Sequence, residues 1–367
     1  MDLREPTREQ MDALVEALMP LPTDQVEWSD VLRELDRRGH PDVVGVYRRL
    51  MREVKPIGSG FAFLHLAACE IFLRRDQSGL LPEVAAGFAQ LDASTYDVDA
   101  LFRLLDQLMF HGLGRVALEL GERFLPIVMV DGDLIGSAKS DLAWRIFELR
   151  LGERIVVPDP GTESQSDLAD ALRERLSDLV SVEASRSAAA TLAAKDAEPV
   201  WSREAFAAWA TGDAGEEEHR DAALTFLGTK IRFVNEAFHI DHHSPPLTWL
   251  GLDGVWRMLT TEDDRRRVPS SNVLDYLVTS GLERRIARAC ADIIGTDVTR
   301  AIAMIRTLGA LVRFTARRGL IPAGQADAVH KSLGRLLVKA GGLTCLAGLG
   351  LISLFLADRL CNTDPGL

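Results

Sequence analysis

The chain has 367 residues, of which 47% are hydrophobic and 26% charged, so it is long enough for two domains and folded rather than disordered. Its formal net charge is −12. This balance excludes a general nucleic-acid binder, which needs a basic face for the phosphates.

Apolar residues at three- and four-residue steps predict helices throughout the first 125 residues. The predicted helices are 11–19, 26–39, 43–54, 61–75, 80–91, 97–109 and 114–124. Residues 61–75 are more uniformly apolar than the rest, which is typical of a central helix, and Pro82 stands near the start of its helix, where a missing amide costs nothing. No convincing strand pattern occurs in this part of the chain.

A weak internal sequence repeat occurs at an interval close to the length of one helical hairpin. Gly39, Gly79 and Gly112 each end a predicted helix, at intervals of 40 and 33 residues. Five positions after each glycine, a small or branched residue begins the packing face of the next helix; these residues are Val44, Val84 and Ala117. This spacing indicates repeated helix-turn-helix units.

The third copy, LFRLLDQLMFHGLGRVALELGERFLP, is the clearest. It resembles a degenerate tetratricopeptide-type hairpin at Leu104, Leu108, Gly112, Ala117, Phe124 and Pro126. The resemblance covers residues 24–126 and is to the helical-repeat class, since the hallmark Trp and Leu-Gly pair of that family are missing. It implies a curved stack of hairpins that presents a groove to a peptide or partner helix.

The middle of the chain is less regular. Residues 127–130 and 155–157 are predicted short strands, with a helix at 138–151 between them. The polar stretch 158–167 is predicted to be a loop. One or two helices follow, at 168–181 and 183–196, and the second is of low complexity.

The second half is again helical. The predicted segments are 203–210, 221–238, 247–260, 272–280, 282–294 and 298–318, with two more helices at the end. Gly319 and Pro322 are predicted to stop the long helix that precedes them. The predicted N-caps are Asp221, Ser271 and Asp297.

These patterns predict an all-α protein. A solenoid-like array of helical hairpins occupies residues 1–158, a linker residues 159–200, and a helical bundle residues 201–367. Within the bundle, residues 340–357 form an eighteen-residue run without a charge, the lower limit for a membrane span. We expect this diluted run, with its four glycines, to be a core helix; the alternative is a C-terminal membrane anchor.

The stretch AFHIDHHSPP gathers the side chains that metal ions bind. His239, Asp241, His242 and His243 lie within five positions, and a zinc site needs three or four such ligands that converge on one point. A helix would place His239 and His243 on one face, and an extended chain would align His239, Asp241 and His243. The simpler interpretation is that these residues cap the helix or satisfy an interface, because Ser-Pro-Pro follows.

Asp241-His242-His243 also resembles the hallmark of the DHH phosphoesterases, which bind manganese. The resemblance implies that Asp131 and Asp133 supply earlier metal ligands after a strand, and that 127–157 is an opening βαβ unit. Asp-x-Asp after an apolar run is also how many glycosyltransferases hold Mg²⁺ or Mn²⁺. The simpler interpretation of this segment is a polar turn in which Gly132 supplies a positive φ.

The four cysteines form no CxxC pair, and the charged N-terminal stretch MDLREPTREQ lacks the apolar core of a secretory signal. A reducing compartment is indicated, and we expect a cytoplasmic protein. No nucleophile elbow, phosphate-cradling P-loop or GxGxxG is present.

The function that we expect is therefore that of a non-catalytic scaffold without a cofactor, which binds a protein or peptide partner through the groove of its helical repeats. Self-association through the C-terminal bundle is a further expectation. The alternative is a metal-dependent hydrolase or phosphoesterase holding zinc, manganese or magnesium. Its ligands are Asp131, Asp133, Asp241, His242 and His243, with His239 as a further candidate. A third interpretation is an adaptor tethered to a membrane by residues 340–357.

Overall fold

The structure is a computed structural model that describes residues 7–21, 25–157, 164–176, 179–194, 216–260 and 298–347. Within these ranges it contains fourteen α-helices, one short 3-10 helix and no strand, which confirms the predicted all-α class. The chain divides into two compact units, residues 1–142 and residues 143–367.

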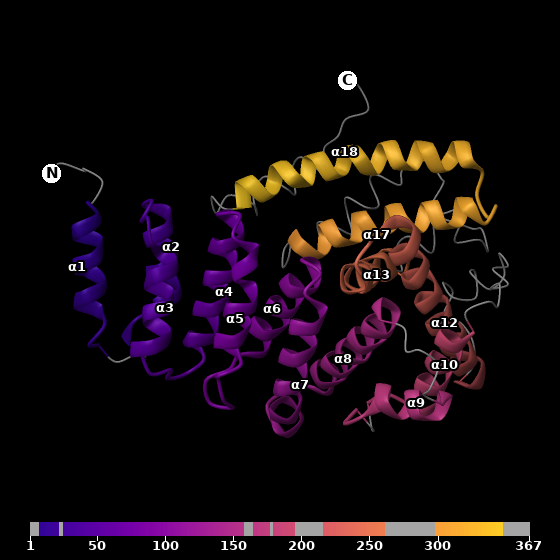
Figure 1. The fold of residues 1–367 in the computed structure, drawn as a ribbon, viewed down its shortest axis with the longest axis horizontal. Helices are drawn as coiled ribbons and strands as arrows, with labels where there is room; N and C mark the ends of the chain where they lie inside the picture. Colours follow the sequence, from indigo (N-terminus) through magenta and orange to yellow (C-terminus); the bar gives the residue numbers. More distant parts are fainter. Residues whose placement is uncertain are drawn as a thin grey trace. The chain divides into compact units, whose positions relative to one another are not determined.

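The first unit is a succession of helices that stand side by side in chain order (Figure 1). They are α1 (Arg8–Leu18), α2 (Trp28–Arg37), α3 (Val43–Glu53), α4 (Gly60–Arg74), the 3-10 helix η2 (Ser78–Leu80), α5 (Leu81–Phe88), α6 (Val98–Phe110), α7 (Gly114–Val130) and the first turns of α8 (Gly136–Val156). Local chemistry explains where several of them begin. The side chains of Asp42 and Asp97 accept hydrogen bonds from amides in the first turns of α3 and α6.

Alternate helices pack on one another. Helix α2 contacts α4, α4 contacts α6, and α5 contacts α7, while α4 and α6 also contact the helices that follow them. Helices α2, α4, α5, α6 and α7 therefore pack against both a neighbour in the chain and an alternate helix. Helix α4 has ten buried residues among its fifteen, in agreement with its uniformly apolar sequence.

Residues with left-handed backbone end α2, α4 and α6. Gly39, Asp76 and Gly112 have φ of 73°, 57° and 74°. In each case the amide of the next residue donates to the carbonyl five positions earlier. The predicted helix ends at Gly39 and Gly112 are confirmed, but the one at Gly79 is wrong, because Gly79 lies in η2 without a positive φ. With Asp76 in its place, the intervals become 37 and 36 residues and are nearly equal.

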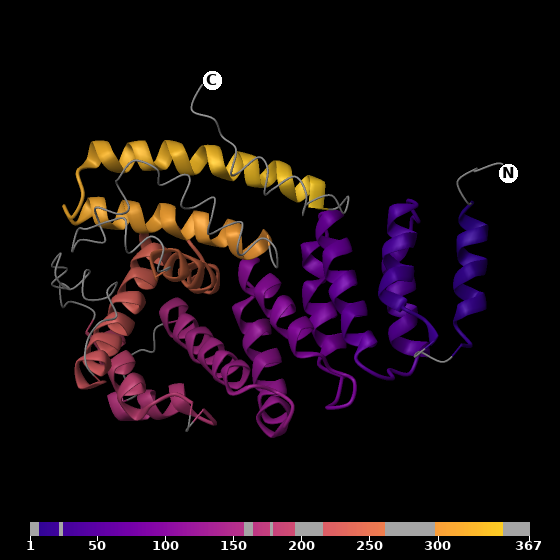
Figure 2. The ribbon, with the colours of Figure 1, turned by 180° about the vertical axis from the view of Figure 1, so that it is seen from behind.

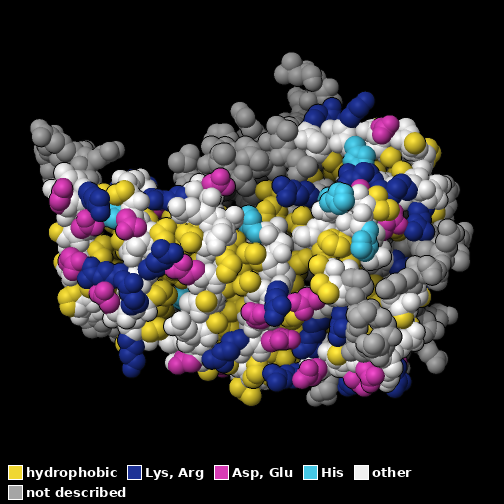
Figure 3. Space-filling view, in the orientation of Figure 1, with side chains coloured by type: hydrophobic (Ala, Val, Ile, Leu, Met, Phe, Trp, Pro, Cys, Tyr) yellow, Lys and Arg dark blue, Asp and Glu magenta, His cyan; other side chains and the backbone are white. Residues whose placement is uncertain are grey.

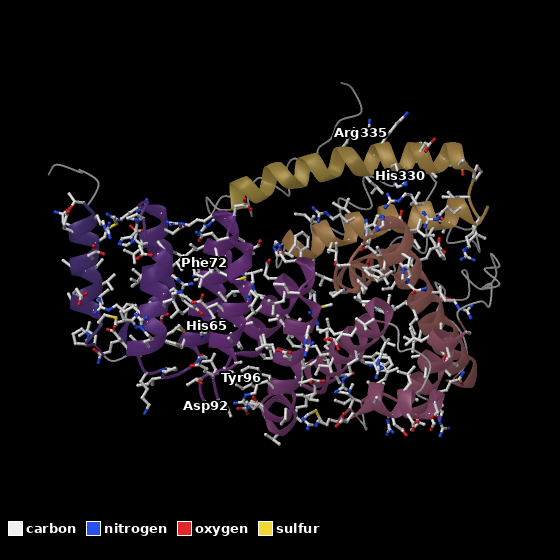
Figure 4. All side chains as sticks on the ribbon, viewed as in Figure 1. His65, Phe72, Asp92, Tyr96, His330 and Arg335 are labelled. Atoms are coloured by element: carbon white, nitrogen blue, oxygen red, sulfur yellow. The ribbon has the colours of Figure 1, made fainter. Side chains whose placement is uncertain are left out.

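A buried polar pair lies in the core of the first unit. The Tyr47 hydroxyl and Nδ1 of His65 are 2.8 Å apart, and both side chains are buried. The His65 ring meets the rings of Tyr47, Phe61 and Phe88 edge-on. Figure 4 shows His65 and Phe72 between the helices of this unit. Burial lowers the pKa of His65 to about 3, so its imidazole is neutral in the folded protein.

The two predicted strands are wrong. Residues 127–130 are the last turn of α7, and residues 155–157 belong to the end of α8 and the residue after it. Helix α7 continues through Pro126: the Asp131 amide still donates to the Ile127 carbonyl, and Val128 is buried. The short β-branched run cannot be assigned by pattern alone, because packing on a core stabilises it as a helix.

The second unit contains the rest of α8 and six further described helices. They are α9 (Gln165–Arg173), α10 (Val182–Ala193), α12 (Glu216–Asp241), α13 (Pro245–Thr260), α17 (Val298–Arg317) and α18 (Ala323–Ala347). Helix α12 contacts α10, α13 and α17, and α17 contacts α13 and α18. Helices α17 and α18 lie side by side in both ribbon views (Figures 1 and 2).

Helices α13 and α17 approach closely where α13 carries glycine. A Cβ on Gly251 would lie 2.5 Å from the carbonyl oxygen of Ala303, and a Cβ on Gly254 would lie 2.9 Å from Cβ of Met304. Trp249, one turn away on α13, is fully buried. Glycine is required at these positions because any side chain would force the two helices apart.

Of the other predicted helix ends, one is confirmed and others are wrong. Gly319 has a φ of 67° and ends α17 as predicted. Asp221 lies inside α12, so its assignment as an N-cap is wrong, and Ser271 and Asp297 lie outside the described residues. Part of the predicted loop 158–167 is helical, because the capping box of Ser164 and Asp167 begins α9; residues 158–163 lie outside the described residues.

The division between the two units falls inside α8, whereas the sequence predicts a linker at 159–200. That stretch contains α9 and α10, which pack on each other. Of the uncharged run at 340–357, residues 340–347 continue α18 and the remainder is outside the described part of the chain. Among the helices described, none combines the length and the apolar run that crossing a bilayer requires.

We predict that Gly251→Ala lowers the free energy of unfolding by roughly 1–3 kcal/mol, because the added methyl collides with the α17 backbone. Gly334→Ala is the matched control on α18, where a Cβ meets nothing within 4 Å. It should stabilise the protein by up to about 1 kcal/mol through helix propensity. Urea unfolding followed by circular dichroism measures both, and equal effects would contradict the close-approach argument.

We predict that the buried His65 makes stability depend on pH. The unfolded histidine takes up a proton near pH 6.5, whereas the folded one does not, so the free energy of unfolding should fall as the pH is lowered from about 6.5 to about 5. In His65→Gln this slope should be shallower by up to about 1.4 kcal/mol per pH unit. The exposed His111, changed to Gln, should leave the slope unchanged; urea unfolding at several pH values decides between the two results.

Candidate functional site

The predicted cluster lies at the end of α12, and the structure spreads its members apart. Helix α12 ends at Asp241, and His239 within its last turn is exposed. His242 has a φ of 55° and turns the chain toward α13. His243 follows in this turn, half-buried. His239 and His243 therefore do not share a helical face, and the segment is not extended.

Asp241 is engaged by two arginines of α17. Its side chain is 7% exposed. Nε of Arg313 donates to one carboxylate oxygen at 2.7 Å, and Nη2 of Arg317 donates to the other at 3.1 Å. Arg317 also binds Glu236, at 3.0 Å through Nε, and Arg318 binds Glu236 at 2.8 Å. These contacts join the last turn of α12 to the last turn of α17.

Electrostatics explains why these arginines are needed. Acidic groups at a helix C-terminus face the negative end of the helix dipole, whereas the basic residues of α17 stand favourably at its own C-terminus. Burial alone would raise the pKa of Asp241, but the hydrogen bonds from Arg317 and Arg313 lower it below its ordinary value. Asp241 is therefore ionised in the folded protein, and its charge is already neutralised by protein groups.

Two histidines lie in the same neighbourhood. Nδ1 of His243 and Nε2 of His330, on α18, are buried and have no hydrogen-bond partner within the described protein. Burial lowers the pKa of both rings, and the charge of Arg313 lowers it further. Figure 3 shows histidine side chains gathered beside Lys and Arg over α12, α17 and α18.

Asp131 and Asp133 belong to the first unit and are used differently. Asp131 caps the end of α7; its carboxylate accepts hydrogen bonds from the Tyr96 hydroxyl and, at 3.0 Å, from the Asp133 amide. The bonds from Tyr96 and from that amide lower the pKa of Asp131. The segment is a polar turn, as one interpretation predicts, but Gly132 does not have a positive φ there.

The metal-site hypothesis is not favoured by these contacts. Within the described ranges, no three His, Cys, Asp or Glu side chains are grouped so that they could hold a metal ion. The βαβ unit implied by the likeness to the DHH phosphoesterases is not formed, since helices occupy residues 127–130 and 136–156. Asp131 and Asp241 also belong to separate units of the chain.

A second arrangement of charged groups crosses three helices of the first unit. Glu70 on α4 binds Arg33 on α2 at 3.4 Å and Arg103 on α6 at 3.1 Å. All three side chains are partly exposed. We call Arg33, Glu70 and Arg103 the charge ladder. Its members are 37 and 33 residues apart, close to the length of one hairpin.

The sequence analysis missed both the charge ladder and the arginines of α17. The signal for the first is opposite charges repeated at the hairpin interval. The signal for the second is composition: residues 298–318 contain five arginines and no acidic residue in a chain of net charge −12. Neither signal by itself shows which residue each charged side chain contacts, because the contacts join residues that are far apart in the sequence.

We predict that Asp241→Asn lowers the free energy of unfolding by roughly 2 kcal/mol at neutral pH, because it weakens charge-assisted bonds and leaves arginines without their anion. Asp327→Asn on α18 is the matched control at an exposed carboxylate, with an expected change within about 0.5 kcal/mol. The pKa of Asp241 is lowered in the folded state, so its stabilisation exists above about pH 4 and is lost as the pH falls further. The difference between wild type and variant should therefore narrow in acid; a pH-independent difference would contradict it.

No protein-family model matches the chain, and the comparisons with curated proteins and with solved structures likewise give no match. Its function is therefore argued from its own residues.

Proposed function

We propose that residues 7–142 form an array of helical hairpins that binds a segment of a partner protein on the face formed by α2, α4 and α6. The hairpins are α2–α3, α4–α5 and α6–α7. The single observation that carries the proposal is the charge ladder, in which three successive first helices present side chains to one continuous surface.

Regular spacing supports the array. Contacts between alternate helices repeat at similar separations: Arg49 on α3 binds Glu16 on α1, 33 residues away, and Arg48 on α3 binds Glu83 on α5, 35 residues away. The left-handed residues that end α2, α4 and α6 repeat at 37 and 36 residues. A stack of similar units, each of which buries its neighbour's apolar face, accounts for this constant register.

Burial supports the choice of face. Helices α2, α4 and α6 have four, ten and seven buried residues, whereas α3, α5 and α7 have three, four and seven. Buried residues make up 21 of the 38 residues in the first set and 14 of the 36 in the second. This is expected of the inner layer of a stack, the layer on which repeat proteins bind extended partners.

The chemistry of the face favours binding over stability. Ion pairs between partly exposed side chains contribute only about 0–1 kcal/mol, so the charge ladder adds little to folding. Half-buried Phe63 and Phe110 lie on the same exposed sides of α4 and α6, at helical spacing from Glu70 and Arg103. The two arginines share Glu70, and Arg33 also binds Asp30 at 3.4 Å, so an acidic side chain of a bound segment would exchange with these carboxylates. With the two phenylalanines beside them, the face suits a segment that brings an acidic and an apolar side chain.

The test begins with peptides selected from a random displayed library on the immobilised full-length chain. We predict that the double variant Arg33→Gln/Arg103→Gln binds these peptides at least about tenfold more weakly, a loss of about 1.4 kcal/mol. The reason is that each arginine donates charge-assisted hydrogen bonds to the bound carboxylates. Fluorescence anisotropy with labelled peptides measures the dissociation constants.

Arg115→Gln is the matched control, because Arg115 lies on α7 with its side chain 83% exposed. It should change the affinity by less than about twofold. Peptides that bind wild type and double variant equally well, or a selection that yields no binder, would refute the proposal. Circular dichroism of each variant shows that any loss of binding is not a loss of fold.

The two alternative functions find less support. The carboxylate of Asp131 is bound by Tyr96, and that of Asp241 is bound by Arg313 and Arg317. A hydrolase that uses these aspartates with His239, His242 and His243 therefore has no observation in its favour. The tethered adaptor depends on residues 340–357, most of which lie outside the described part of the chain.

A further inference from the structure

The turn between α7 and α8 exposes large apolar side chains. Val130 is 82% exposed, Ile135 72% and Met129 38%, and all three lie between positions 129 and 135. We call Met129, Val130 and Ile135 the apolar tip. Single exposed apolar residues are ordinary, whereas a group of them on one surface marks a place where another molecule binds. The partner-binding face proposed above lies on α2, α4 and α6 and does not include the apolar tip.

The turn that carries the apolar tip is held in shape by polar groups. The carboxylate of Asp131 accepts hydrogen bonds from the Tyr96 hydroxyl and, at 3.0 Å, from the Asp133 amide. Nζ of Lys139 donates to the carbonyl of Met129 at 3.1 Å. These bonds order the backbone between the two helices. An ordered surface loses less conformational entropy when a partner binds, so the turn is prepared for binding.

The exposure of the apolar tip follows from helix geometry and from open space beside it. Val128 is buried, and Val130, two positions later on the same helix, points to the opposite side. A Cβ added to Gly132 or to Gly136 would meet nothing within 4 Å in the part of the chain that the structure describes. The surface around the apolar tip is therefore open to another chain.

The surroundings of the apolar tip are acidic. The bond from Tyr96 brings the segment 92–99, which leads into α6, onto the turn, and Figure 4 shows Asp92 and Tyr96 at the same end of this unit. Residues 92–99 and 126–139 together contain five Asp and one basic residue, Lys139. An apolar centre with a charged rim is the usual anatomy of a protein interface.

This charge selects among the molecules that could cover the apolar tip. Pairing with a second copy of the chain, tip against tip, would bring Asp131 and Asp133 toward the same carboxylates of the other copy, and like charges oppose association. A phospholipid surface is neutral or negative, so it offers nothing to neutralise the acidic rim. A protein segment with Lys or Arg beside an apolar side chain complements both the tip and its rim.

We propose that the apolar tip is a docking site for a protein segment that carries an apolar side chain flanked by Lys or Arg. The apolar side chain would pack on Val130 and Ile135 and remove their surface from water. The flanking cations would pair with Asp133, which is exposed, and with the neighbouring carboxylates. Rim charges of this kind mainly set the orientation and the rate of association, whereas the apolar contact supplies most of the affinity.

The test uses two displayed peptide libraries selected on the immobilised full-length chain. Both have randomised apolar positions, flanked by Lys and Arg in the first library and by Asp and Glu in the second. Labelled peptides from the first library should bind Val130→Ser/Ile135→Ser at least about tenfold more weakly, and Asp133→Asn about threefold more weakly, in fluorescence anisotropy. Their affinity for Arg33→Gln/Arg103→Gln should not change, which separates this site from the partner-binding face.

Ile57→Ser/Val157→Ser is the matched control, because it removes the same two types of side chain from other positions, which are 48% and 70% exposed. It should change the affinity by less than about twofold. Circular dichroism of each variant verifies that it is folded. The docking site is refuted if the first library yields no peptide that depends on Val130 and Ile135, or if the second library yields such peptides equally well.

Two further measurements examine the other molecules that could cover the apolar tip. Sedimentation of the full-length chain measures self-association, and flotation with vesicles of phosphatidylcholine and phosphatidylserine measures membrane binding. Neither should differ between the wild type and Val130→Ser/Ile135→Ser. Self-association or vesicle binding that this variant loses and the matched control keeps would overturn the proposal, because the second copy or the lipid would then be what the apolar tip binds.

Discussion

Most helices of the first unit have one apolar side to bury, whereas α4 is apolar almost all round, and this difference organises the packing of the unit. A helix that covers only its chain neighbour would leave part of that side in water. Stacking α2 on α4 and α4 on α6 buries the apolar area that would otherwise stay in water. It also makes α4 the most deeply buried helix of this unit. In the array that we propose, the similar spacing of the cross-helix contacts follows from units of nearly equal length.

The same stacking buries one polar pair in the core and leaves a set of charged side chains partly exposed. The Tyr47–His65 pair lies in the core, where a hydrogen bond makes a neutral histidine tolerable. The charge ladder lies at the rim, where Glu70 joins two arginines at little gain in stability. The first pair is thus enclosed by the core, whereas the second set is partly exposed to solvent.

In the second unit, the C-terminal end of α12 carries an unfavourable concentration of negative charge. Helix α12 ends in Asp241, and the negative end of its dipole adds to that charge. The arginines in the last turn of α17 neutralise both, and so they hold α12 against α17. In a segment whose sequence is typical of metal ligands, Asp241 therefore forms ion pairs that connect α12 to α17. His243 and His330 lie near Arg313 in the same region.

What the sequence by itself determined is local: the helical class, most helix positions, the central place of residues 61–75, and helix ends at Gly39, Gly112 and Gly319. These features depend on periodicity and on backbone preferences within a few residues. Asp76 was missed because a non-glycine residue at positive φ carries no strong signal. Residues 127–130 were assigned wrongly because a short β-branched run fits either element until its packing is known.

Only the tertiary structure decided which charges meet. Arg313 is 72 residues from Asp241, and Glu70 lies 37 and 33 residues from its two arginines. It also engaged Asp131 with Tyr96 and Asp241 with the arginines of α17. The physical reason is that a side chain's partner is set by how distant helices pack, and the pattern within one helix shows which face is buried but not what covers it.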